Sequence, residues 1–100
     1  MSSEQERRKR LEVLHDWLKD QIESGALDYI TVEVSPGNAI HLVNNYKSYL
    51  SAQNSMHFRV INEARKRYGV SMPTAKDYSD IVVSAFREEI IKRFVKPIRL

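Results

Sequence analysis

The sequence predicts a small, mainly α-helical domain with about four helices and one short strand or β-hairpin between the first two helices. Apolar residues recur at three-to-four spacing over most of the chain, whereas only one β-branched run alternates apolar and polar side chains. A chain of 100 residues with 42% hydrophobic residues supports one core, and no linker, repeat or low-complexity tract divides it. We therefore expect residues 1–100 to form a single compact domain.

The first helix is expected over about residues 4–24. Ser3 and Glu6 have the spacing of a capping box, which satisfies unpaired backbone N–H groups at a helix start, and Gly25 suits the left-handed position after a helix end. The apolar stripe consists of Leu11, Leu14, Leu18 and Ile22, widened by Val13 and by Trp17, which suits either the core or an interface. Residues 1–10 are expected to form a basic arm prone to fray.

The run Asp28–Val34 is expected to form a strand, because Ile30, Val32 and Val34 alternate with polar residues. The turn Ser35–Asn38 then either closes a hairpin onto residues 39–43 or starts a second helix. A helix fits the longer stretch to about residue 51 better, since its apolar residues fall in one arc.

A polar break over residues 52–55 predicts a third helix over about 55–68 and a fourth from Thr74 to the residues before Pro97. The third helix is expected to face inward with Phe58, Ile61, Ala64 and Tyr68. The fourth helix carries two apolar stripes, the first made of Tyr78, Ile81, Val82 and Ala85 and the second of Val83, Phe86, Ile90 and Phe94. Because one small core is not expected to cover both, the second stripe is a candidate interface of a homodimer or larger oligomer.

The charge is basic, with 16 Lys and Arg against 13 Asp and Glu, a net charge of +3. Between Val34 and Lys76 the only carboxylate is Glu63. A nucleic acid needs cations that project together for its phosphates, and Arg or Asn for base edges. The candidate nucleic-acid-binding residues are Arg59, Asn62 and Lys66 on one face of the third helix, the flanking Arg65 and Arg67, and the N-terminal cluster of Arg7, Arg8, Lys9 and Arg10.

With the preceding helix, which has His41, Asn44 and Ser48 on its polar side, the third helix is readable as a helix-turn-helix. The simpler alternative is a solvated helix face on which Glu63 pairs with Arg59 and Arg67 at a spacing of four. The N-terminal cluster equally suits solubility or contact with phosphates.

Several classes of function lack support in the sequence. The absence of Cys excludes disulfides, thiol catalysis and Cys-type zinc sites, and the three histidines are scattered, so neither a metal site nor a cofactor is expected. No nucleophile elbow, phosphate loop or paired catalytic carboxylates indicate an enzyme. Without a membrane-length apolar run or an N-terminal signal core, we expect an intracellular protein, cytoplasmic or nuclear, with no membrane partner.

The favoured interpretation is a small basic protein that binds nucleic acid, either DNA or RNA, and acts as an oligomeric regulator or replication accessory. The rival interpretation is a protein-interaction or oligomerisation module that uses the apolar faces of the first and fourth helices and has no role with nucleic acid.

Overall fold

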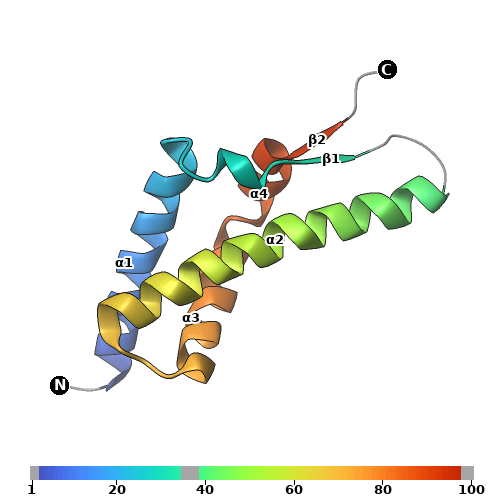
Figure 1. Ribbon diagram of the computed structural model, residues 1–100. Helices are drawn as coiled ribbons and strands as arrows, with labels where there is room; N and C mark the ends of the chain where they lie inside the picture. The colour runs from blue at the N-terminus through green and yellow to red at the C-terminus, as the bar shows by residue number, and fades with distance from the viewer. Residues whose placement is uncertain (1–2, 35–38, 98–100) are drawn as a thin grey trace.

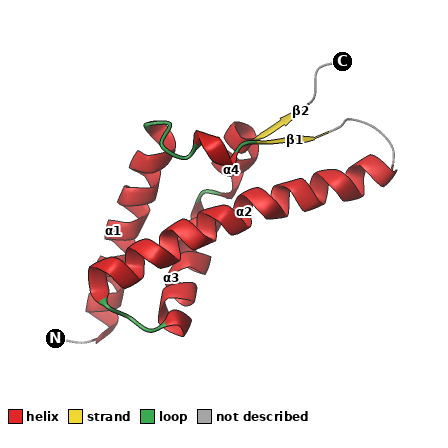
Figure 2. Ribbon diagram, viewed as in Figure 1, coloured by secondary structure: helices red, strands yellow, loops and turns green. Residues whose placement is uncertain are grey.

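The computed structural model describes residues 3–34 and 39–97, and the side chains of residues 4–31 and 50–96. Its elements follow in the order α1 (Ser3–Glu23), the 3-10 helix η1 (Asp28–Ile30), β1 (Val32–Val34), α2 (Ala39–Tyr68), α3 (Met72–Ala85), α4 (Arg87–Phe94) and β2 (Val95–Pro97). Figures 1 and 2 show α1 and α3 packed along the C-terminal half of α2, and the two strands beside its N-terminal half. The predicted mainly helical class is confirmed for the described residues, which form four helices, but one predicted break between helices is absent and one predicted helix is divided in two.

Helix α1 agrees with its prediction to within one residue at each end. Leu14, Leu18 and Ile22 are buried along one side, and Gly25 has a φ of 82°, the left-handed conformation that glycine adopts without strain. The first two turns do not form a separate arm, because residues 3–10 are helical and Arg7 contacts Asp77 of α3.

The predicted break between the second and third helices is wrong, because residues 39–68 form one continuous helix of 30 residues. Residues 52–55 contain neither glycine nor proline, Ala52 is buried, and Ser55 donates its hydroxyl hydrogen bond to the carbonyl of Ser51 one turn earlier, at 3.1 Å. Such a helix is about 45 Å long at 1.5 Å per residue. The molecule is consequently elongated, with extents of 55 × 26 × 18 Å.

The predicted fourth helix is divided in two at Phe86, which has a φ of −107° and a ψ of 16° and separates α3 from α4. Helix α3 also begins earlier than predicted. Its N-cap is Ser71, whose hydroxyl accepts a hydrogen bond from the backbone N–H of Thr74, and Pro73 stands in the first turn, where its missing N–H costs nothing.

Of the two alternatives between the first two helices, the short strand is observed and the β-hairpin is wrong. Residues 28–30 form η1 and only residues 32–34 form a strand, while residues 39–43, the expected partner, begin α2. Strand β1 instead pairs in parallel with β2, with Val32 opposite Val95 and Val34 opposite Pro97. The expected turn at residues 35–38 lies outside the described residues.

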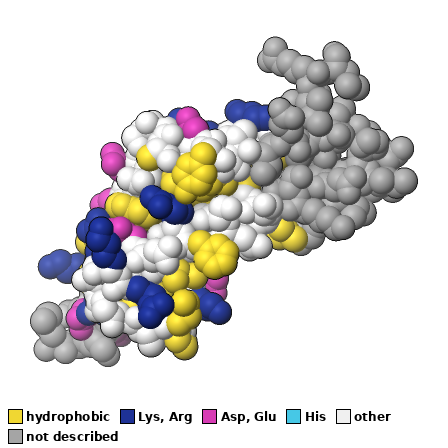
Figure 3. Space-filling view, viewed as in Figure 1, with side chains coloured by type: hydrophobic (Ala, Val, Ile, Leu, Met, Phe, Trp, Pro, Cys, Tyr) yellow, Lys and Arg dark blue, Asp and Glu magenta, His cyan; other side chains and the backbone are white. Residues whose placement is uncertain are grey.

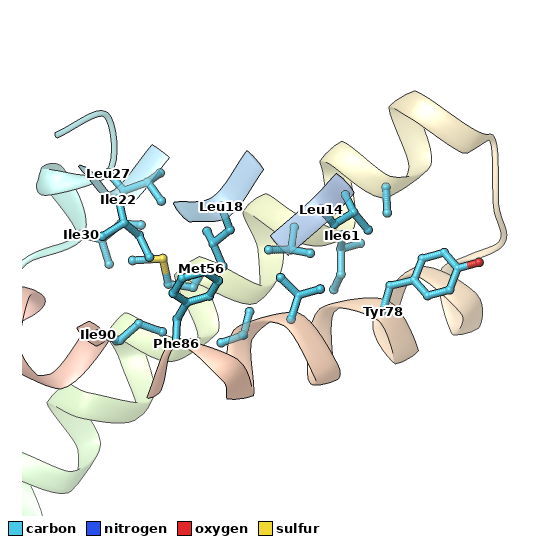
Figure 4. Close-up of a cluster of buried hydrophobic side chains, with 14 of the residues drawn as sticks. Leu14, Leu18, Ile22, Leu27, Ile30, Met56, Ile61, Tyr78, Phe86 and Ile90 are labelled. Atoms are coloured by element: carbon cyan, nitrogen blue, oxygen red, sulfur yellow. The ribbon is translucent and has the colours of Figure 1, made fainter. Parts of the chain in front are cut away.

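One hydrophobic core joins α1, η1, α2, α3 and α4 (Figure 4). The side chains of Val83, Phe86, Ile90 and Phe94, the candidate oligomer interface, all belong to this core and are buried within one chain. The premise that a single chain leaves this stripe uncovered is therefore wrong. Self-association itself stays a prediction, but these four side chains are not accessible to a second copy on the surface of the protomer.

Candidate nucleic-acid interface

The outward face of α2 carries most of the predicted nucleic-acid-binding residues. Arg59, Asn62, Arg65 and Lys66 are all exposed. None of the three cations among them forms an ion pair with a described residue. On a helix, positions three, four and seven apart lie on the same side, so these residues form one surface, which we call the basic face of α2.

Phe58 lies at the N-terminal end of this face, with 67% of its surface exposed, and its predicted inward orientation is wrong. The buried residues Ala52, Met56, Val60 and Ala64 follow at intervals of four, and Ile61 extends their arc. Residue 58 falls on the opposite side of the helix from Met56 and Val60. Ile61 and Ala64 are buried as predicted, and the regular spacing of smaller apolar residues was the signal for the correct orientation.

The fourth predicted cation of α2, Arg67, has a partner. Its Nε lies 3.3 Å from Oε1 of Glu63 one turn earlier. Since Glu63 is the only carboxylate in α2, this ion pair uses the one acidic side chain of the helix. The alternative interpretation, in which Glu63 pairs with both neighbours, is thus observed for Arg67, while Arg59 forms no ion pair within the described part of the chain.

The N-terminal cluster does not form a single patch, because successive residues of a helix project about 100° apart. Arg7 donates a hydrogen bond to Asp77 at 2.9 Å. Arg10 pairs with Glu6, donates to the Tyr78 hydroxyl at 3.4 Å and stacks over the Tyr68 ring at 4.8 Å. The hydrogen bond to Tyr78 raises the pKa of Arg10, so these contacts keep its charge in place between α1, α2 and α3.

Arg8 and Lys9 are exposed and form no ion pair with a described residue. Lys9, Arg10, Val13 and Tyr68 line a shallow groove between α1 and the end of α2. Tyr68 follows Arg65 by three residues, so the groove opens beside the basic face of α2. Figure 3 shows Lys and Arg side chains interspersed with hydrophobic ones over this part of the surface.

The helix-turn-helix interpretation is wrong, because that motif needs two helices joined by a turn and the structure has one helix there. The side chains of His41, Asn44 and Ser48, its other expected members, lie outside the described residues.

A polar cluster of His57, Ser79 and Asp80 joins α2 to α3. Nδ1 of His57 lies 2.7 Å from the hydroxyl of Ser79, the one buried polar side chain of the described core, and 3.8 Å from Oδ1 of Asp80. Burial lowers the pKa of His57, and the nearby Asp80 opposes this shift. The three residues do not have the geometry of a catalytic triad, since serine and aspartate contact the same ring nitrogen and the hydroxyl is buried.

A second groove separates α1 from α3, and Leu11, Ile81 and Ala85 form its apolar part, with Arg8, Glu12 and Asp16 at its edge. Ile81 and Ala85, expected in the core, are thus exposed. Among the described residues no three His, Asp or Glu side chains are grouped to hold a metal ion. None of the described helices combines the length and the apolar character that crossing a membrane requires.

No protein-family model, curated protein or solved structure matches this chain.

Proposed function

We propose that this protein binds nucleic acid through the basic face of α2, supplemented by Lys9 of α1. The observation that carries the proposal is the cluster of Arg59, Arg65 and Lys66. These three cations project from one rigid helix without an ion-pair partner among the described residues. Cations that project together from one helix are placed to contact neighbouring phosphates, and Asn62 among them adds an amide that is able to reach a base edge.

The partner that fits this surface is DNA or RNA, and a regulator or a replication accessory is the role we favour. The rival, a protein-interaction module, has less support because the apolar stripes assigned to it lie mainly in the core. Under this rival interpretation, the surface on which a protein partner would dock is the groove of Leu11, Ile81 and Ala85.

The proposal is tested with the triple variant Arg59→Ala/Arg65→Ala/Lys66→Ala. Binding of labelled duplex DNA, single-stranded DNA and RNA is measured by fluorescence anisotropy at several salt concentrations. We expect weaker binding of the nucleic acid that the protein prefers. On duplex DNA, the slope of log affinity against log salt should fall by about 0.9 for each phosphate that the variant no longer neutralises.

The matched control is Lys19→Ala/Arg87→Ala/Lys92→Ala, which removes the same charge from exposed positions on α1 and α4. If both triple variants weaken binding equally, the effect is one of net charge and the basic face of α2 is not the site. Failure of the unmodified protein to bind any of the three nucleic acids would refute the function itself.

A further inference from the structure

Phe58 is an unusual residue to expose in this protein. The other two phenylalanines, Phe86 and Phe94, are 7% and 0% exposed, whereas Phe58 is 67% exposed. Its exposure follows from the continuous course of α2, whose buried side is already occupied by Met56 and Val60. The helix therefore holds an aromatic ring outward at a fixed position.

The surroundings of the ring are polar and basic. One turn before Phe58 stand Asn54 and Ser55, which are small, and the Ser55 hydroxyl is already bound to the backbone carbonyl of Ser51. On the other side Asn62 follows by one turn and Arg65 by two. The ring is thus flanked by small side chains on one side and by an amide and a cation on the other.

This combination matches the chemistry of single-stranded nucleic acid. An unpaired base has a free face that stacks on an aromatic ring, while cations beside the ring contact the sugar-phosphate backbone. In a duplex the faces of the bases are covered by their neighbours, so a ring on a helix surface has nothing on which to stack. Resting on the nucleic-acid function proposed above, we infer that Phe58 stacks on an unpaired base and that the basic face of α2 prefers single-stranded nucleic acid to duplex.

The test compares Phe58→Ala, Phe58→Leu and Phe58→Tyr with the unmodified protein. Binding of a labelled oligothymidylate and of a mixed-sequence duplex of equal length is measured by fluorescence anisotropy. We expect the Ala and Leu variants to bind the single strand roughly five- to hundredfold more weakly, the range expected when one base no longer stacks on an aromatic ring. The Tyr variant keeps its ring and should retain affinity, and duplex binding should not change in any variant.

Because the Phe58 side chain is exposed, all three variants should keep the helical circular dichroism and melting temperature of the unmodified protein. Unchanged affinity for the single strand in the Ala variant, equal losses on both nucleic acids, or full affinity in the Leu variant would each overturn the stacking role. In those cases the basic face still binds nucleic acid and the proposed function stands. Only a lack of binding by the unmodified protein would remove both.

Discussion

The surroundings of His57 predict how the stability of the protein depends on pH. It contacts Ser79 and Asp80 across the junction of α2 and α3, and burial lowers its pKa. An unfolded chain titrates histidine near pH 6.5, so below that pH the unfolded state binds more protons than the folded state. The free energy of unfolding is therefore fully maintained above about pH 6.5 and decreases as the pH falls toward the lowered pKa.

We accordingly predict that the melting temperature of the unmodified protein falls between about pH 7 and pH 5 more steeply than that of His57→Asn. The asparagine keeps a polar group near the Ser79 hydroxyl but does not titrate. The control is His15→Asn, which removes a histidine that stacks on Phe86 with ring centroids 4.6 Å apart. Equal pH slopes for His57→Asn and the unmodified protein would show that His57 does not cause the decrease.

The burial of Ser79 helps to explain why the buried side of α3 differs from the prediction. The buried side of this helix consists of Ala75, Tyr78, Ser79, Val82 and Val83, which include members of both predicted stripes. A serine in an apolar stripe breaks the pattern in the sequence. Here burial is tolerated because the hydroxyl is hydrogen-bonded to His57, a contact 22 residues away in the chain that no local pattern reveals.

At the scale of elements, α2 illustrates what polar composition does not determine. Residues 52–55 resemble a loop because Gln, Asn and Ser are frequent in loops, but all three are compatible with a helix when no glycine or proline is present. Ala52 and Met56, both buried, fix this segment on the core side of the helix. Packing of one face thus outweighs the weak local preference.

We predict that Asn54→Ala stabilises the protein by about 0.5 kcal/mol, because Asn54 is exposed within a helix and alanine is the better helix former. Asn54→Pro should destabilise it by about 3 kcal/mol or more, since proline removes a backbone hydrogen bond and clashes with the preceding turn. Urea unfolding followed by circular dichroism measures both. A neutral Ala variant together with a tolerated Pro variant would indicate a turn at residues 52–55 instead.

The division between α3 and α4, in contrast, is not marked by any residue that usually interrupts a helix. No glycine or proline lies near Phe86, so local sequence predicts an uninterrupted helix. The second apolar stripe nevertheless indicates correctly that these residues are buried. A turn at Phe86 brings Ile90 and Phe94 into the same core as Val83, which resolves the two-stripe pattern within one chain. Burial of these residues within one chain removes the reason for assigning the stripe to a contact with a second copy.

At the scale of the whole molecule, the pairing of β1 with β2 is the feature that sequence patterns were least able to predict. Each strand has three residues, and α2, α3 and α4 all lie between the two strands in the sequence. Neither has a turn signal that identifies its partner, because a parallel pair needs a long connection. The basic residues of α2, in contrast, were identifiable from the sequence, since exposed cations need only the absence of nearby carboxylates and a helical spacing.

Oligomeric state is the remaining whole-molecule property, and Ile90 and Ile91 provide a matched pair to test it. Ile90 is 1% exposed and Ile91 is 42% exposed, although they are neighbours in α4. We predict that Ile90→Glu unfolds the protomer, because burying an unpaired carboxylate costs several kcal/mol, a large part of the stability of a small domain. Ile91→Glu should keep its circular dichroism and melting temperature, since its carboxylate stays in water.

Light scattering on both variants distinguishes a core residue from an interface residue. A folded Ile90→Glu protein that merely dissociates from a larger assembly would show that the stripe of Val83, Phe86, Ile90 and Phe94 joins two copies in solution. If the unmodified protein is larger than a monomer and Ile91→Glu alone dissociates it, the contact between copies uses the outer side of α4 while the buried stripe serves the core of each chain.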